Sequence, residues 1–143
     1  MLEGYPIVWE FSVPFADIDM LQHVNNVAYL RWAETLRAEY FARVMHETVH
    51  GERGMIQASI AFSYERPLRY RDRIIVGCRI PRIGTRSWDF TYEVWCVDRR
   101  ERAAHGTTSM VAYDFVAERT IPIPEGWRDA IATFEQGPVQ RFS

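Results

Sequence analysis

The sequence predicts a single α+β domain, residues 1–143, in which a five-stranded, mostly antiparallel sheet packs around one long central helix. Two observations predict this class. One alternating apolar segment precedes a long helical segment, and four more alternating segments follow it in succession. A third observation supports a single domain, because no repeat or linker divides the chain. With 143 residues, 48% of them hydrophobic, the chain can bury a core without metals or disulfides.

The composition narrows the class of protein. A net charge of −2 and a pI near 6.1 give no reason to expect a nucleic-acid partner or a membrane surface. Cys78 and Cys96 show no metal-binding or redox spacing, so we expect reduced, buried thiols in a cytoplasmic protein. The start "MLEGYPIVWEF" does not resemble a signal peptide, and no apolar segment is long enough for membrane insertion.

The first strand is expected at residues 6–15, where every second residue is apolar: Ile7, Trp9, Phe11, Val13 and Phe15. The period then changes, which predicts a helix from Asn26 to about Met45. Its apolar stripe recurs at steps of three and four: Tyr29, Trp32, Ala33, Leu36, Tyr40 and Val44. Four charged residues fall outside that stripe: Arg31, Glu34, Arg37 and Glu39.

Four strands are expected next, at residues 56–66, 73–82, 87–97 and 103–116, with turns at 67–72, 83–86 and 98–102. Their succession predicts a meander of hairpins. In the first of them, alternation places one apolar face toward the core: Ile56, Ala58, Ile60, Phe62 and Tyr64. A proline-rich segment then leads into a short C-terminal helix that begins near Glu125. The face of the sheet that points away from the helix must also be shielded from water. The many aromatic residues indicate that self-association of the protein buries part of this face.

The segment "DIDMLQHVNN", residues 17–26, lies between the first strand and the long helix. The first turn of a helix has N–H groups without partners and a partial positive charge. It can therefore bind an anion or polarise a carbonyl oxygen, and a carboxylate just before it can act as a base or nucleophile. Asp and Asn are also ordinary helix caps. The residues alone leave a capping turn and an active site both open.

The segment "VPFADIDMLQHVNNVAYLRWAETLR" resembles the N-terminal signature of hotdog-fold acyl thioesterases of the 4-hydroxybenzoyl-CoA thioesterase class, especially members with D-x-D-x-x-x-H-V-N-N-x-x-Y. "IGTRSWDFTYEVW" and "YDFVAERTIPIPEGWRDAI" resemble later parts of the same domain, so the resemblance covers nearly the whole chain. It implies a hotdog fold and hydrolysis of acyl-CoA or acyl-ACP (acyl carrier protein) thioesters in fatty acid metabolism, without a metal or other cofactor. It also implies a homo-oligomer, dimer or tetramer, with active sites at the subunit interface.

The resemblance implies a role for each residue of this motif. Asp19 is the catalytic carboxylate, and the backbone amide at about Asn26 polarises the thioester carbonyl. His23 matches a histidine of plant-type acyl-ACP thioesterases, where it either orients water and moves a proton or only holds the loop by hydrogen bonds. Leu21 replaces an Asn of those relatives, and Gln22 replaces a Gly of many bacterial members.

Other residues are candidates for substrate binding. Asn25 either contacts the substrate or satisfies loop backbone groups, and Tyr29 is either a contact or helix core. Asp17 is expected to be a turn or cap residue. The phosphates of a carrier suit arginine, and all 17 basic residues are Arg, although a solvated surface of mixed charge is the alternative. Arg66 and Arg86, among several arginines at strand ends, are the phosphate candidates.

Two alternatives remain from the sequence. Residues 46–50, "HETVH", fit the zinc-protease pattern H-E-x-x-H, but the segment ends a helix and no third histidine follows at the required spacing. We therefore expect no metal site there. The second alternative is a non-hydrolytic protein that binds acyl-CoA or an acyl carrier on the same fold, because a fold does not determine an activity.

Overall fold

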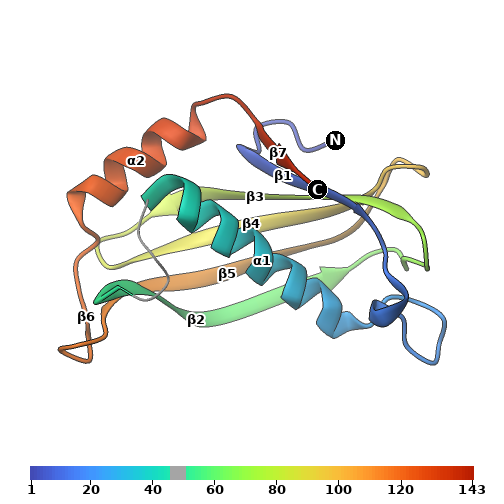
Figure 1. Ribbon diagram of the computed structural model, residues 1–143, viewed down its shortest axis with the longest axis horizontal. Coiled ribbons are helices and arrows are strands. Elements are labelled where there is room, and N and C mark those ends of the chain that lie inside the picture. Colours follow the sequence, from blue (N-terminus) through green and yellow to red (C-terminus); the bar gives the residue numbers. More distant parts are fainter. Residues whose placement is uncertain (46–50) are drawn as a thin grey trace.

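The computed structural model describes residues 1–45 and 51–143. A long helix, α1 (Asn26–Met45), lies across one face of a mixed β-sheet, with a second helix, α2 (Glu125–Glu135), beside it (Figure 1). Both helices begin where the sequence predicts. The expected arrangement of a sheet packed against one long central helix is confirmed.

Over residues 1–45 and 51–143, the sheet has seven strands rather than the five predicted. The five expected strands are β1 (Ile7–Ser12), β2 (Arg53–Tyr64), β3 (Arg73–Ile83), β4 (Ser87–Cys96) and β5 (Glu101–Asp114). The additional ones are β6 (Arg119–Thr120), which pairs with β5, and β7 (Gln140–Phe142), which pairs in parallel with β1. Strands of two or three residues are too short to show an alternating pattern.

The predicted four-strand meander is wrong for its first strand. The strand order is β2-β5-β4-β3-β1-β7, so β2 pairs antiparallel with β5 and not with β3. The connection at residues 65–72 crosses the end of the sheet, where the Leu68 carbonyl accepts a hydrogen bond from Val24 and the Asp72 carbonyl accepts one from Val13. Crossing three strand spacings takes about 15 Å, which eight residues span easily.

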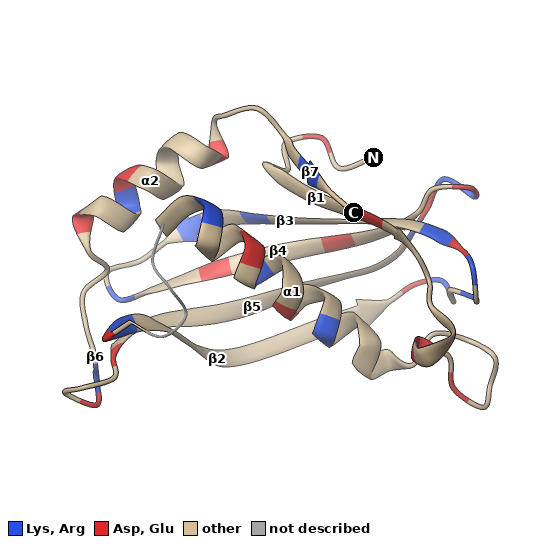
Figure 2. Cartoon of the chain, viewed as in Figure 1, with Lys and Arg blue, Asp and Glu red and all other residues tan. Residues whose placement is uncertain are grey.

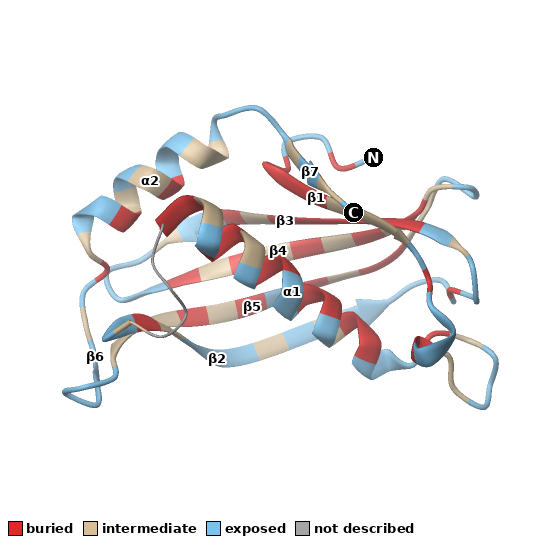
Figure 3. Ribbon diagram, in the orientation of Figure 1, coloured by how far each residue is buried: buried red, intermediate tan, exposed pale blue. Residues whose placement is uncertain are grey.

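The alternating apolar residues of β4 and β2 differ in how far they are buried. In β4 the predicted face is fully buried: Trp88, Phe90, Tyr92, Val94 and Cys96. In β2 none of the five predicted core residues is buried, because β2 is an edge strand (Figure 3). Ile60 and Phe62 are half-buried, and Ile56 and Tyr64 are exposed. The predicted burial of this face is therefore wrong.

The core lies between α1 and the sheet, and the whole predicted stripe of α1 is buried in it. Arg37, which the pattern places outside the stripe, is buried as well. On the opposite face of the sheet, a small cluster of Leu2, Tyr5, Val8 and Ile75 covers part of the surface. Both cysteines are buried and free. Neither helix, over the ranges described, is long and apolar enough to cross a membrane.

Candidate active site

A cleft of about 360 Å³ opens where the chain enters α1. Six of the residues predicted for the site line it: Asp19, His23, Asn25, Asn26, Tyr29 and Arg66. Tyr64, Glu65 and Pro67, which the sequence did not identify, complete the opposite wall. The loop before α1 and the end of β2 therefore meet at one site, although they are about 40 residues apart in the chain.

The loop between β1 and α1 has a buried root, formed by Asp17 and its partners. Asp17 is only 9% exposed and ends a short 3-10 helix, Phe15–Asp17. Its two carboxylate oxygens accept hydrogen bonds from Arg31 Nη2 at 2.6 Å and from Trp32 Nε1 at 3.1 Å. Its carbonyl accepts a hydrogen bond from the Asn25 amide. Asp17 thus fixes the loop to α1 and has a structural role, as expected for a turn residue.

The tip of the loop, residues 19–22, is a tight turn stabilised by Asp19. The Asp19 Oδ1 atom accepts a hydrogen bond from the Leu21 amide at 2.9 Å, and its backbone pairs with His23 and Gln22. Gln22 has a φ of 64°, in the left-handed region that favours glycine. Within the described part of the chain, the Asp19 Oδ2 atom accepts no hydrogen bond. One carboxylate oxygen therefore closes the turn, and the other has no hydrogen-bond partner among these residues.

In the first turn of α1, the Val27 amide has a hydrogen-bond acceptor and the Asn26 amide has none among the described residues. The Asn25 Oδ1 atom accepts a hydrogen bond from the Val27 amide at 2.9 Å, and its carbonyl accepts one from the Ala28 amide. Asn25 therefore satisfies backbone groups, one of its two predicted roles. The Asn26 amide donates to no acceptor among residues 1–45 and 51–143, while the Asn26 carbonyl accepts a hydrogen bond from Tyr64 Oη. A carbonyl oxygen bound in the cleft could accept a hydrogen bond from that amide.

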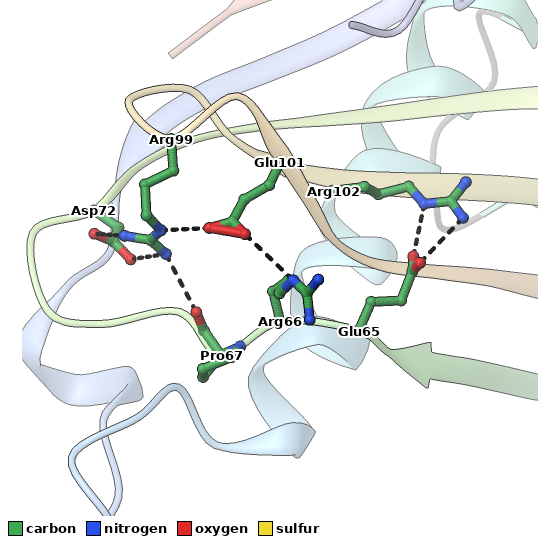
Figure 4. Close-up of polar contacts among 7 residues, drawn as sticks. All are labelled: Glu65, Arg66, Pro67, Asp72, Arg99, Glu101 and Arg102. Atoms are coloured by element: carbon green, nitrogen blue, oxygen red, sulfur yellow. Dashed lines mark hydrogen bonds and ion pairs between the residues drawn. The ribbon is translucent and has the colours of Figure 1, made fainter.

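Ion pairs hold the wall opposite the loop (Figure 4). Glu65 pairs with Arg102 at 2.6 Å, and Arg66 lies 3.4 Å from Glu101. Arg99 joins Glu101 to Asp72 and also donates to the Pro67 carbonyl. The Arg66 side chain is still 65% exposed, so its guanidinium can meet a phosphate. Acidic and basic residues are interspersed over the helices and strand ends (Figure 2).

Two tyrosines of the cleft are neutral hydrogen-bonding groups. Burial raises the pKa of the Tyr29 phenol, and the neighbouring Tyr64 and Asp72 raise it further. Burial also raises the pKa of Tyr64. Tyr29 belongs to the core and lines the cleft at the same time, so both of its predicted roles fit its position.

Two predicted features do not join this cleft. Arg86 immediately precedes β4, whose first residue, Ser87, pairs with Val111 near the far end of the sheet, and the Arg86 guanidinium donates to the Thr120 carbonyl at 3.0 Å. Tyr64 of the cleft pairs with Ala104 on the same strand, β5, which puts roughly 20 Å of strand between the two sites. The "HETVH" segment, residues 46–50, lies outside the described residues. Among those that are described, no three His, Cys, Asp or Glu side chains are grouped to hold a metal ion.

Comparison with known proteins gives consistent matches. Residues 13–131 match the family model of the thioesterase-like superfamily. A thioesterase from Thermus thermophilus, solved with coenzyme A and Zn, is 30% identical, with a TM-score of 0.83 and coverage of 96% of this chain and 100% of that one. The PA5185 protein from Pseudomonas aeruginosa is 28% identical, with a TM-score of 0.83 and 96% coverage of each chain. A search of curated protein sequences gives no significant match.

A more distant structure shows the fold alone. The 1,4-dihydroxy-2-naphthoyl-CoA thioesterase from Synechocystis is 18% identical, with a TM-score of 0.79 and coverage of 91% of this chain and 98% of that one. The sheet packed against a central helix is thus retained at low sequence identity.

Proposed function

We propose a function from one premise: the chain belongs to the thioesterase-like superfamily. The protein hydrolyses acyl thioesters to a free carboxylic acid and a thiol. One observation carries this proposal: among the residues described, Asp19, which has an unpaired carboxylate oxygen, and Asn26, which has an unpaired amide, line the same cleft at the entrance of α1.

The proposed reaction uses few groups. The thioester carbonyl oxygen accepts a hydrogen bond from the Asn26 amide, which makes the carbonyl carbon more electrophilic. Asp19 then either takes a proton from a water molecule that attacks this carbon, or attacks it directly. The C–S bond breaks, and the thiolate leaves and takes up a proton. In the direct route, water then hydrolyses the mixed anhydride, so both routes end with one acid and one thiol.

The other residues of the cleft have supporting roles in this proposal. His23 orients the attacking water or delivers the proton to the leaving thiolate. Tyr29 and Asn25 border the acyl group close to the reacting carbon. Arg66, exposed at the rim, meets a phosphate of the carrier. Arg86 is not included, because it lies at the other end of the sheet.

Coenzyme A is the first candidate carrier. The similar thioesterase from Thermus thermophilus was solved with coenzyme A, and the rim of this cleft carries an exposed arginine. An acyl carrier protein is the second candidate. An assay of the same acyl group on each carrier decides between them, because the natural carrier should give the higher kcat/KM.

We also propose a cytoplasmic homo-oligomer, a dimer or a pair of dimers, in which the edges of β2 meet. β2 is a long edge strand with half-buried or exposed apolar residues, including Ile56, Ile60 and Phe62. Such an edge is a template for pairing with another strand. Light scattering on the purified protein tests this, and a monomeric mass at micromolar concentration contradicts it.

The activity is tested by measuring thiol release from a panel of acyl-CoAs, for the parent protein and Asp19→Asn. We expect hydrolysis by the parent and loss of most turnover in the variant. Asp114→Asn is the matched control, because the Asp114 Oδ1 atom also accepts backbone amides in a surface turn, outside the cleft. Equal turnover by Asp19→Asn and the parent would contradict the catalytic assignment. Binding without hydrolysis across the panel would favour the alternative, a non-hydrolytic acyl-CoA or acyl-carrier binding protein.

A further inference from the structure

A second cavity, of about 310 Å³, lies between α1 and the strands β2 and β5. It shares no lining residue with the cleft. Most of its wall is apolar and includes Ala38, Phe41, Met55, Met110 and Phe115. Arg37 also lines it. The same wall also carries Glu34, Arg53 and Gln57, so Arg37 is one of several polar groups that face an otherwise apolar cavity.

Arg37 is buried without a counter-ion. The residue lies in the middle of α1 and is only 8% exposed. Its one hydrogen bond to a described residue runs from Nη1 to Tyr92 Oη and is long, at 3.4 Å. No carboxylate of the described residues forms an ion pair with it. A guanidinium has five N–H donors, so several of those on Arg37 remain available to a ligand in the cavity.

Tyr92 does not neutralise this charge. Burial raises the pKa of its phenol, and the opposing effect of Arg37 does not overcome that rise, so the phenol stays neutral. Its oxygen already pairs with the Thr108 hydroxyl at 2.7 Å. Tyr92, which is itself held by Thr108, therefore positions Arg37, and Glu34 of the same wall forms no ion pair with the guanidinium.

We propose that this cavity receives the far end of the acyl group and that Arg37 binds an anionic group there. The preferred substrates are then thioesters of dicarboxylic acids, with a free carboxylate at the end distant from sulfur. This inference rests on the proposed function. A carboxylate matches the planar guanidinium with two parallel hydrogen bonds, which a terminal methyl group cannot provide.

The position of Arg37 indicates the length of the acyl group. Arg37 follows Asn26 by eleven positions on one helix, which is about 16 Å along the axis. A helical side chain leans toward the N-terminus, which shortens this span to on the order of 10 to 16 Å. An extended carbon chain advances about 1.3 Å per bond, so the span corresponds to roughly eight to twelve carbons.

The experiment compares matched pairs of substrates. Mono-CoA thioesters of dicarboxylic acids with six to fourteen carbons are assayed beside methyl-terminated acyl-CoAs of the same lengths. We expect the parent to prefer the acid-terminated member by at least about tenfold in kcat/KM, and Arg37→Met to reduce its hydrolysis about 100-fold while sparing the methyl-terminated member. Arg37→Lys, which keeps the charge, should retain an intermediate preference. Arg43→Met is the control on the same helix, because Arg43 pairs with Glu39 and does not line the cavity.

Binding separates this inference from the proposed hydrolysis. Calorimetry on Asp19→Asn with the same pairs should give a lower Kd for the acid-terminated ligand, and Arg37→Met should remove the difference. That outcome supports the inference even if no thioester is hydrolysed. Equal Kd values for both members overturn it even if hydrolysis is observed. It is also overturned if Arg37→Met changes only the oligomeric mass, because the counter-ion is then a carboxylate of a second copy of the chain.

Discussion

Asp17 at the root of the loop and Asp19 at its tip lie two positions apart, yet their carboxylates have different surroundings. The Asp17 carboxylate is buried, and both of its oxygens accept hydrogen bonds from α1. Asp19 is half-buried and uses one carboxylate oxygen to close a turn in which Met20 is 94% exposed. A fully paired carboxylate fixes geometry, whereas a partly paired one remains able to react.

In the proposed mechanism the two acids have complementary roles. A catalytic carboxylate in an exposed loop loses its orientation unless the loop is anchored elsewhere. The root supplies the anchor through Arg31, Trp32 and the Asn25 amide, which connect the loop to the first turns of α1. The same contacts bring the Asn26 amide to the cleft that Asp19 lines. Variants of Asp19, Asp17 and Gln22 test this division of roles, and Asp72 tests the wall opposite the loop; the largest expected effect comes first.

The largest expected effect is on turnover by Asp19→Ala. Loss of a general base or nucleophile should lower kcat by about 10²- to 10⁴-fold. The free energy of unfolding should fall by less than about 1 kcal/mol, because only one exposed turn hydrogen bond disappears. Thiol release and urea denaturation measure the two quantities. A stability loss above about 2 kcal/mol with unchanged kcat would reverse the roles given to root and tip.

The next largest effect is on stability, in Asp17→Ala. Removing this carboxylate leaves Trp32 Nε1 buried without an acceptor and should cost about 2 to 3 kcal/mol. Arg31→Ala removes the other member of the ion pair, whose side chain is 54% exposed, and should cost under about 1 kcal/mol. Urea midpoints at constant m-value give both numbers. Equal losses in the two variants would show that the root is an ordinary surface ion pair.

Much of the fold follows from local periodicity in the sequence. The bounds of α1 and the start of α2 agree with the prediction, because helix periodicity and the absence of internal proline are local properties. The position of β2 does not follow in this way. Its alternation resembles that of β4, and only the connection over residues 65–72 decides that it becomes an edge beside β5. Periodicity identifies a strand without identifying its neighbour.

The candidate site was predictable from the sequence where a single segment contains its residues. The loop motif places Asp19, His23 and Asn26 in one cleft. Tyr64 and its neighbours were missed because contacts between distant segments bring them there, among them the hydrogen bond from Val24 to the Leu68 carbonyl. Arg37 was placed outside the apolar stripe, although it lies four positions from both Ala33 and Phe41, which are buried. That spacing was the available signal for its burial.

A smaller effect, on the free energy of unfolding, is expected at acid pH. It comes from Asp72, in the wall opposite the loop. Partial burial raises the pKa of the Asp72 carboxyl, but hydrogen bonds from Arg99 and the Arg69 amide outweigh it, so the pKa lies below its ordinary value. The folded state then binds fewer protons than the unfolded state. The stabilisation is present at neutral pH and is lost as pH falls through the lowered pKa.

Urea denaturation from pH 7 to pH 3 should therefore show a loss of stability at the acid end. Asp72 should account for about 1 kcal/mol or less of it, because Arg99 is partly solvated. Asp72→Asn should flatten this part of the curve, and Asp98→Asn, whose contact with Arg73 is long and exposed, should leave it unchanged. A curve that Asp72→Asn does not alter would show that this ion pair does not stabilise the wall.

The smallest effect, a gain in stability, is expected at the tip of the loop from Gln22→Gly. Gln22 has a φ of 64°, which costs a residue with a side chain about 1 kcal/mol or more. Glycine avoids that strain but loses more backbone entropy on folding, so the net gain should be about 0.5 kcal/mol. A rise in Tm of about 1 to 3 °C is the expected reading. Gln22→Ala keeps the strain and should show no gain, and an equal rise in both variants would rule out backbone strain as its source.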